Sequence, residues 1–329
     1  MILHYSDIDK NKWGSFVKSH PLGNIFQTPE MFQIYLKQGG NQPLAIALTD
    51  ENEELQGILL AIVISKGLFT KWFTSRSIII GGPLASEDNA SIVQQLVDEY
   101  KRVLPKYVVY TEIRPVYSIE SIESSLMDNH FIRIGHYNLF LDISPDKAIL
   151  WDNLHKERKR NIKKALASGL VFQEVTSEDD ILKIVNLIRS TYKRKRVPLT
   201  NYDTLLNARS VLKQNIRFFA VFYNGQIIAG QVRLCYSSLI YAWYAGSDEA
   251  YLKLYPNDFL MWNVICWSHD AGYRVFDFGG GGEPGIHYGV RDYKLKYGCE
   301  MRDFGRFQIR HHPLIYKLGA FAIKHFSKR

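Results

Sequence analysis

The sequence predicts an α/β fold in which two similar units, each with a mixed sheet, follow one another in tandem. Three observations predict it. At 329 residues the chain exceeds the commonest size of a single domain. Its 46% hydrophobic and 13% aromatic content is enough to fill packed cores. Helical and strand patterns alternate along the whole chain, in a similar order in the two halves. We expect the units at residues 1–145 and 146–310, followed by a helix over 311–329.

The first half begins with a helical pattern closed by glycines and continues with two apolar strands that meet at an Asp/Asn/Glu turn. A second helix follows a Ser/Asp cap, and a later strand is stopped by Pro115. The elements expected here are a helix over 29–40, strands within 43–65, a helix over 86–104, a strand over 108–114 and a strand pair over 131–144.

The second half repeats this scheme, and the boundary is expected near residues 143–146, where ISPD ends a strand and opens a helix. A hairpin is expected at Asn224-Gly225. The elements expected here are helices from Trp151 to Ala167 and over 178–195, strands over 170–175, 216–224, 226–238 and 238–247, a helix over 256–273, a strand over 274–279, a loop, strands within 299–310 and a terminal helix. This order is typical of an N-acyltransferase-type α/β domain.

The charge is distributed unevenly. Residues 1–145 carry 12 Lys and Arg against 16 Asp and Glu, a net −4, whereas residues 146–329 carry 29 against 17, a net +12. The basic half is expected to meet an anion, and nucleic acid, a nucleotide diphosphate and an anionic lipid all qualify. Three widely spaced cysteines favour a reduced, cytoplasmic setting and no zinc site. The longest apolar segment, ILLAIVI, is far shorter than the roughly 18–20 residues of a membrane span.

Two clusters of cations have alternative interpretations. The helix containing HKERKRNIKKA directs Lys and Arg outward, either as a solvated face or as a contact with phosphates. Its apolar face is expected to comprise Trp151, Leu154, Ile162, Ala165 and Leu166, and its outward cations Lys156, Lys159, Arg160, Lys163 and Lys164. In TYKRKRVP, four cations at one helix end exceed what the helix dipole requires, which favours a site for a substrate anion. No motif for sequence-specific DNA binding occurs.

The stretch FDFGGGGEPGIHYGVRDYKLKYG joins a strand to four glycines and a basic, aromatic loop. It lacks the GxxxxGK[ST] of a P-loop, and no helix follows the glycines as in a dinucleotide-binding motif. Glycines at the end of a strand allow backbone to approach a ligand. Lys294, three residues after Arg291, then either stabilises a developing oxyanion or lies solvated at the strand edge.

Covalent catalysis is not expected, because no GxSxG motif occurs and no cysteine has a recognisable site context. Direct transfer between two bound substrates fits better. The terminal segment PLIYKLGAFAIKHFSKR is amphipathic and basic, which favours packing against a domain, with an anionic membrane surface as the second interpretation.

Four segments resemble the Fem family of non-ribosomal peptidyl transferases and its acetyltransferase-like relatives. They are WDNLHKERKRNIKKALASGLVF, TYKRKRVP, YAGSDEAYLKLYPNDFLMWNVICWSHDAGYRVFDFGG and YGVRDYKLKYGCE, with FQTPEMF as a weaker match. The resemblance implies two acetyltransferase-like domains in tandem, with transfer of an amino acid from aminoacyl-tRNA to an amine of a peptidoglycan-type envelope precursor.

The resemblance also implies roles for single residues. Lys294 matches the lysine that stabilises the ester carbonyl, and Tyr293 matches the aromatic residue beside it. Arg194 and Lys37 match basic positions that bind phosphates of the precursor. The substrate-binding set comprises Lys37, Arg194, Arg196, Tyr244, Gly280, Gly281, Glu283 and Arg291, with no metal.

The donor and the class of protein are open at this stage. YAGSDEAYLKLYPND lacks the [QR]xxGx[GA] loop that binds the pyrophosphate of coenzyme A, which favours aminoacyl-tRNA, without a permanently bound cofactor, over acyl-CoA. The expected partners are a phosphate-bearing envelope precursor and tRNA, with peripheral contact to the inner membrane surface as an alternative. An N-acyltransferase of envelope polysaccharide biosynthesis and a non-catalytic binder of anionic ligands are the competing functions.

Overall fold

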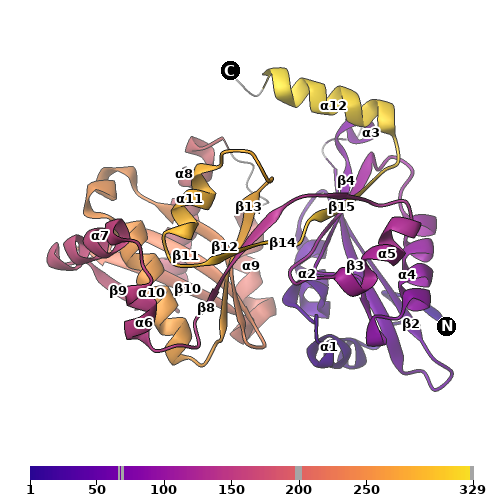
Figure 1. The fold of residues 1–329 in the computed structure, drawn as a ribbon, viewed down its shortest axis with the longest axis horizontal. Coiled ribbons are helices and arrows are strands. Elements are labelled where there is room, and N and C mark those ends of the chain that lie inside the picture. The colour runs from indigo at the N-terminus through magenta and orange to yellow at the C-terminus, as the bar shows by residue number, and fades with distance from the viewer. Residues whose placement is uncertain (66, 68–69, 197–201, 327–329) are drawn as a thin grey trace. The chain divides into compact units, whose positions relative to one another are not determined.

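The computed structural model describes residues 1–65, 67, 70–196 and 202–326, with backbone alone for residues 202–203 and 322–326 (Figure 1). The chain divides into two compact units. Unit 1 comprises Met1–Gly135 together with Phe304–Arg329, and unit 2 comprises His136–Asp303. Each unit contains a mixed sheet and helices. The predicted α/β class with two similar units is confirmed.

Three helices of unit 1 begin at a side chain that caps their first turn. Asp9 and Thr28 accept hydrogen bonds from the first-turn amides of α1 and α2, and Asn89 does so for α4. The elements of unit 1 are β1 (Ile2–His4), α1 (Lys10–Ser19), η1 (Ile25–Gln27), α2 (Pro29–Lys37), β2 (Asn41–Thr49), β3 (Leu55–Ile64), α3 (Lys71–Thr74), β4 (Arg76–Ile80), β5 (Leu84–Ala85), η2 (Ser86–Asp88), α4 (Ala90–Val103), β6 (Tyr110–Arg114), α5 (Glu120–Asp128), β7 (Ile132–Ile134), β15 (Arg306–Arg310) and α12 (Pro313–Phe326).

Unit 2 repeats the alternation of helices and strands. Its elements are β8 (Tyr137–Asp142), α6 (Lys147–Asp152), α7 (Lys156–Ala167), β9 (Val171–Glu174), α8 (Glu178–Arg194), α9 (Tyr202–Leu212), η3 (Lys213–Asn215), β10 (Ile216–Tyr223), β11 (Gln226–Tyr236), β12 (Leu239–Ser247), η4 (Glu249–Leu254), α10 (Pro256–Asp270), β13 (Val275–Gly282), α11 (Gly289–Leu295) and β14 (Glu300–Asp303).

The two sheets have the same strand order. In unit 1 the order is β1-β2-β3-β4-β6-β15-β7, with β5 beside β3, and in unit 2 it is β9-β10-β11-β12-β13-β8-β14. In each sheet the fourth and fifth strands of this order are parallel: β4 with β6, and β12 with β13. A parallel pair requires a crossover connection, which α4 supplies in unit 1 and α10 in unit 2.

The chain crosses between the units at residues 135/136 and 303/304 rather than at the predicted 145/146 and 310/311. The predicted strand pair over 131–144 does form two strands, but they belong to different sheets. β7 pairs with β15 in unit 1, whereas β8 pairs with β13 and β14 in unit 2. The observed boundary between the units thus falls between β7 and β8, because these two strands pair in different sheets.

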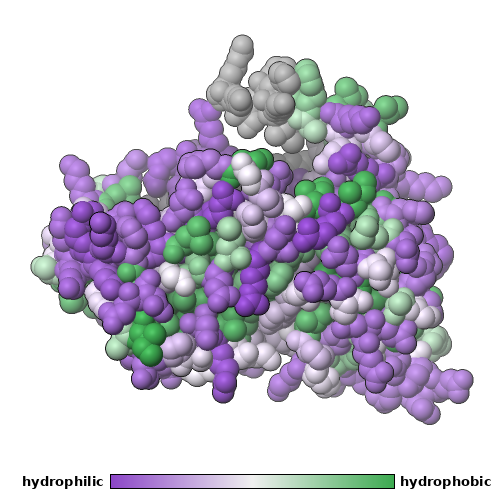
Figure 2. All heavy atoms as spheres, in the orientation of Figure 1, coloured by the Kyte–Doolittle hydropathy of each residue, from purple (hydrophilic) through white to green (hydrophobic). Residues whose placement is uncertain are grey.

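Three expectations about the helices of unit 2 need correction. The helix predicted from Trp151 to Ala167 is two helices, α6 and α7, because His155 has extended backbone and caps α7. Leu166, predicted to lie on the apolar face, is 65% exposed. The cationic face of α7 points outward as expected, and Figure 2 shows hydrophilic side chains over this helix. The predicted loop after the glycines contains the short helix α11.

Candidate active site

The parallel strands β12 and β13 separate partway along their length. They pair from Leu239 with Val275 only as far as Tyr241 with Asp277. Beyond that point β12 continues beside β11, and β13 continues beside β8. The residues that follow the last pair, 242–247 on β12 and 278–282 on β13, form what we call the fork. The fork opens directly at Asp277.

The four glycines form most of the β13 side of the fork, and the backbone angles of two of them and the close neighbours of the other two favour glycine. Gly279 and Gly282 have φ angles of +75° and +80°, which other residues adopt at a cost. A Cβ on Gly280 would lie 2.8 Å from Nε2 of His136, and the glycine at 281 faces Leu139 at 2.4 Å. The run is therefore a closely packed strand end and not a flexible linker.

α11 is fastened to this strand end by two basic side chains. Lys294 Nζ donates to the carbonyl of Gly280 at 2.8 Å. Arg291 donates to the carbonyls of Gly281 and Glu283 at 3.3 and 3.2 Å, and also to the carbonyl of Ile286. The structure thus brings together Lys294, Gly280, Gly281, Glu283 and Arg291, all of them predicted site residues. Through these bonds the Arg291 guanidinium holds the loop between β13 and α11. A contact between Arg291 and a substrate stays a prediction.

Asp277 is a buried carboxylate that sequence reasoning missed. It is 0% exposed, Oδ1 accepts from the amide of Gly279 at 2.6 Å, and Oδ2 has no hydrogen-bond partner among the described residues. Burial raises the pKa of Asp277 to about 7, although the Gly279 amide and Lys294 oppose the shift. The signal in the sequence was an acidic residue inside the apolar strand VFDFG.

Burial has the opposite effect on Lys294 because it disfavours the charged form. It lowers the pKa of Lys294 to about 8, while Asp277 acts to raise it. At pH 7 a group with this pKa is protonated in about nine molecules of ten. Arg233, which is 1% exposed and stacks over the ring of Phe276 at 4.8 Å, adds positive charge near the same region and lowers the Lys294 pKa further. The site therefore holds a lysine that is only partly exposed.

Tyr293 belongs to a buried set of hydrogen bonds that we call the polar cluster. The cluster links α7, α10 and α11 through Arg158, Asn161, Asp258, Tyr293 and Tyr297. Asp258 accepts from Arg158, from Asn161 at 2.7 Å and from the Tyr297 hydroxyl at 3.1 Å. The Tyr293 and Tyr297 hydroxyls are 2.9 Å apart, and the Arg158 guanidinium lies 4.6 Å from the Tyr293 ring. The cluster positions α11, and through it Lys294.

On the other side of the fork, aromatic residues gather near the end of α8. The ring of Tyr244 on β12 lies 5.8 Å from that of Tyr192. Burial raises the pKa of Tyr192 to about 12, and Tyr244 and Tyr288 contribute.

The remaining predicted residues lie at the surface. Arg194 ends α8 and its Nε lies 3.6 Å from Glu249 Oε2. Arg196 is exposed with a φ of +53°. Lys37 is exposed in the last turn of α2 and belongs to unit 1. Val197 and Pro198 of the TYKRKRVP motif lie outside the described residues.

Neither metal ligation nor an activated thiol is found in the part of the chain that the structure describes. No group of His, Cys, Asp or Glu there is arranged to hold a metal ion. Burial raises the pKa of Cys235 and Cys266 to about 11 and that of Cys299 to about 12, which disfavours the thiolate.

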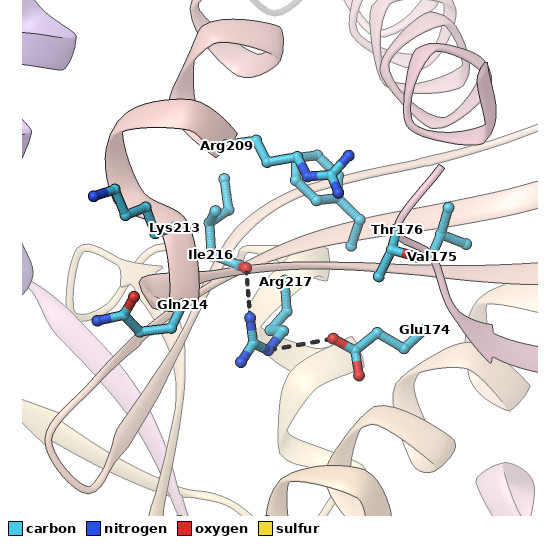
Figure 3. A pocket seen from close by; sticks show the side chains of 9 residues that line it. Glu174, Val175, Thr176, Arg209, Lys213, Gln214, Ile216 and Arg217 are labelled. Carbon is cyan, nitrogen blue, oxygen red and sulfur yellow. Dashed lines mark hydrogen bonds and ion pairs between the residues drawn. The ribbon is translucent and has the colours of Figure 1, made fainter. Parts of the chain in front are cut away.

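A cavity of about 250 Å³ lies at the β9 edge of the unit 2 sheet, with β11 between it and the fork (Figure 3). Arg209 and Arg217 reach it from α9 and β10, and Arg217 Nε lies 3.2 Å from Glu174 Oε1. No motif pointed to this cavity. Its lining comprises Glu174, Val175, Thr176, Arg209, Lys213, Gln214, Ile216, Arg217 and Phe218.

Comparison with known proteins identifies this fold. Residues 153–295 match the model of the acetyltransferase (GNAT) domain. The structure is similar to that of FemX, with 15% identity, a TM-score of 0.75 and coverage of 97% of this chain and 99% of that one. It is also similar to a tandem GNAT protein of the clavulanic acid pathway, at 10% identity, a TM-score of 0.59 and coverage of 94% and 98%.

A third similar structure is the C-terminal domain of a putative lysylphosphatidylglycerol synthetase from Agrobacterium fabrum, at 13% identity, a TM-score of 0.57 and coverage of 95% and 96%. The comparison with curated protein sequences gave no match. At these identities the structures establish the fold, while the family model identifies the domain that carries the fork. Residues 153–295 therefore match the model of a GNAT domain, and the chain as a whole has a fold similar to those of FemX and of the tandem GNAT protein.

Proposed function

We propose that the chain is an aminoacyltransferase that forms an amide bond on an amine of a cell-envelope precursor, with aminoacyl-tRNA as the donor. The GNAT domain and the Fem-like fold support a transferase of the acyltransferase class. The observation that carries the proposal is the placement of Lys294 at the fork, where it is partly buried and hydrogen-bonded to the carbonyl of Gly280.

In the proposed reaction the acceptor amine attacks the carbonyl carbon of the aminoacyl ester. A C–N bond forms, the C–O bond to the tRNA ribose breaks, and a proton from the amine goes to the ribose oxygen. The Lys294 ammonium has three N–H donors and uses one on Gly280, which leaves two for the developing oxyanion. When it is ionised, Asp277 favours the protonated form of Lys294.

The start of α10 supports aminoacyl-tRNA over acyl-CoA. The segment between β12 and α10 is the 3-10 helix η4, and Tyr255 after it has a φ of +58°. The first turn of α10 carries Asp258, a carboxylate already engaged in the polar cluster. An acidic first turn disfavours a pyrophosphate at this helix N-terminus. The net +12 of residues 146–329 suits an RNA donor.

The similar structures also bear on the donor. One is named a putative lysylphosphatidylglycerol synthetase, whose product carries an aminoacyl group. The clavulanic acid protein is named with reference to acetyl-CoA, which keeps an acyl-CoA-dependent N-acyltransferase as the second candidate. For the acceptor we propose a phosphate-bearing precursor, with Arg194 and Arg196 of unit 2 as ligands of its phosphates, while a phosphate contact of Lys37 in unit 1 stays a prediction from the family resemblance.

The test offers both donors to the same protein. Envelope precursors are incubated with charged tRNA or with acetyl-CoA, and the products are analysed by mass spectrometry. We expect a mass increment of one amino-acid residue with charged tRNA, product formed about 100-fold more slowly or less by the Lys294→Ala variant, and normal product from Lys183→Ala, which removes an exposed lysine of α8. An increment with acetyl-CoA alone would establish the second candidate, and no product with either donor would favour a non-catalytic binder.

A further inference from the structure

Two neighbouring helices of unit 1 expose large apolar side chains. α12 exposes Leu314 (77%), Leu318 (68%) and Phe321 (60%), and α3, which contacts it, exposes Phe73 (65%) and Trp72 (46%). Four of these rank among the six most exposed large hydrophobic residues of the described chain. Figure 2 shows hydrophobic side chains over the part of α12 that is not grey. Apolar patches of this kind mark interaction surfaces.

α12 is held to unit 1 by its opposite face. The Tyr316 ring packs edge-on against Tyr110 at 5.3 Å, and Arg310 lies 4.3 Å from the same ring. The His312 ring is hydrogen-bonded to the carbonyl of Lys106 at 2.7 Å. The exposed residues 314, 318 and 321 follow the i, i+4, i+7 spacing of one helix face. That face is therefore left outward by the packing of the helix itself.

The sequence segments that form or contact this patch carry basic residues and no acidic ones. The segments 65–76, 101–111 and 304–329 contain no Asp or Glu and carry 12 Lys and Arg, although residues 1–145 as a whole have a net charge of −4. The contacts of Tyr316 and His312 join the last two segments, and an edge contact of Trp72 with Tyr107, at 6.1 Å, joins the first. Some of these cations have acidic partners, but Lys71 and Lys317 border the patch itself.

We propose that α3 and α12 dock unit 1 on the surface of an anionic phospholipid bilayer. Apolar side chains enter between the head groups, while lysines on the same helices meet lipid phosphates. A bilayer fits better than a protein partner because lysine is depleted at protein interfaces. Lysine on a membrane-bound helix instead extends its stem along the apolar layer and keeps its charge at the head groups. Among the described helices none is long and apolar enough to cross a bilayer.

The test measures binding of the full chain to vesicles by co-sedimentation. We expect binding to vesicles of phosphatidylglycerol and phosphatidylcholine at least tenfold tighter than to phosphatidylcholine alone, and weaker binding as salt rises. Leu314→Ser with Leu318→Ser should lower the affinity more than tenfold. The matched control is Leu166→Ser, which changes an equally exposed leucine of unit 2 and should bind like the wild type.

Charge variants test the second half of the proposal. Lys71→Gln and Lys317→Gln should each weaken binding about fivefold, whereas Lys163→Gln, on exposed α7, should not. Circular dichroism checks that each variant is folded. If the variant with both leucine substitutions is not folded, Phe73→Ser on α3 takes its place in the binding assay.

The proposal is overturned if patch and control variants bind alike, or if neutral and anionic vesicles bind equally. It is also overturned if the wild type does not bind vesicles. This holds for a monomer, and equally for a dimer that the leucine variants disrupt.

Discussion

The buried carboxylate at the start of the fork gives a quantitative prediction. Replacing Asp277 by Asn keeps the shape of the side chain and an oxygen that accepts from the Gly279 amide. It removes only the ability to ionise. The variant therefore isolates the free energy of placing a negative charge at a position that is 0% exposed.

The magnitude follows from the pKa of Asp277, which rises from 3.8 to about 7 on folding. Each pKa unit corresponds to about 1.4 kcal/mol, so the ionised form is disfavoured by about 4 kcal/mol as an upper value. Between these two pKa values the folded state binds more protons than the unfolded state. The stability of the wild type should consequently fall as pH rises from 4 towards 7, and this loss should stop above pH 7.

The assay is urea unfolding of both proteins at pH 5, 6, 7 and 8, followed by circular dichroism. The asparagine variant should be more stable than the wild type by about 1.7 kcal/mol at pH 5 and by up to about 4 kcal/mol at pH 8. Asp270→Asn, which alters a surface carboxylate, serves as a control and should differ by less than about 0.5 kcal/mol. If the free energies of unfolding of the variant and the wild type differ by the same amount at pH 5 and at pH 8, the conclusion that Asp277 is buried and titrates with a raised pKa is refuted.

Further predictions concern the rest of the site. Lys294→Ala should lower turnover about 100-fold or more while the fold persists; near-normal turnover would contradict its assignment. Wild-type turnover should decline as pH rises through about 8, where Lys294 loses its proton. Asp258→Asn removes the buried carboxylate that pairs with Arg158, leaves only the partly exposed Glu157 at 2.8 Å, and should destabilise unit 2 by about 3 kcal/mol, visible as a lower urea midpoint. Gly246→Ala places a Cβ 2.5 Å from the backbone of Ile188 and should lower the melting temperature by several degrees, whereas Ala245→Ser, on the exposed neighbour, should not.

Most strands and helices could be predicted from the sequence because their apolar periods and caps are local signals. α11 was missed because Gly289–Leu295 is short and exposed, and what holds it is a set of bonds to carbonyls of the glycine strand. The sequence also did not predict that β7 and β8 belong to different sheets, because β7 pairs with β15, which lies far along the chain.

At the site, the glycines and the family resemblance were enough to find Lys294. The polar cluster was not found, because Arg158 lies in a run of cations that looked uniformly like surface. The available signal was its spacing: Arg158 and Asn161 are three residues apart and share the face of Ile162, and all three are buried. Asp277 was overlooked because a single acid inside an apolar strand was counted as part of the strand.

The strand order has a consequence for synthesis of the chain. Unit 2, His136–Asp303, contains every strand of its own sheet. Unit 1 does not, because β15, which lies between β6 and β7, is encoded after the whole of unit 2. As the chain leaves the ribosome, the unit that begins first is completed last. Until residues 306–310 emerge, β6 keeps an open edge and β7 has no sheet to join, so this interval is when the nascent chain is most exposed to wrong pairing.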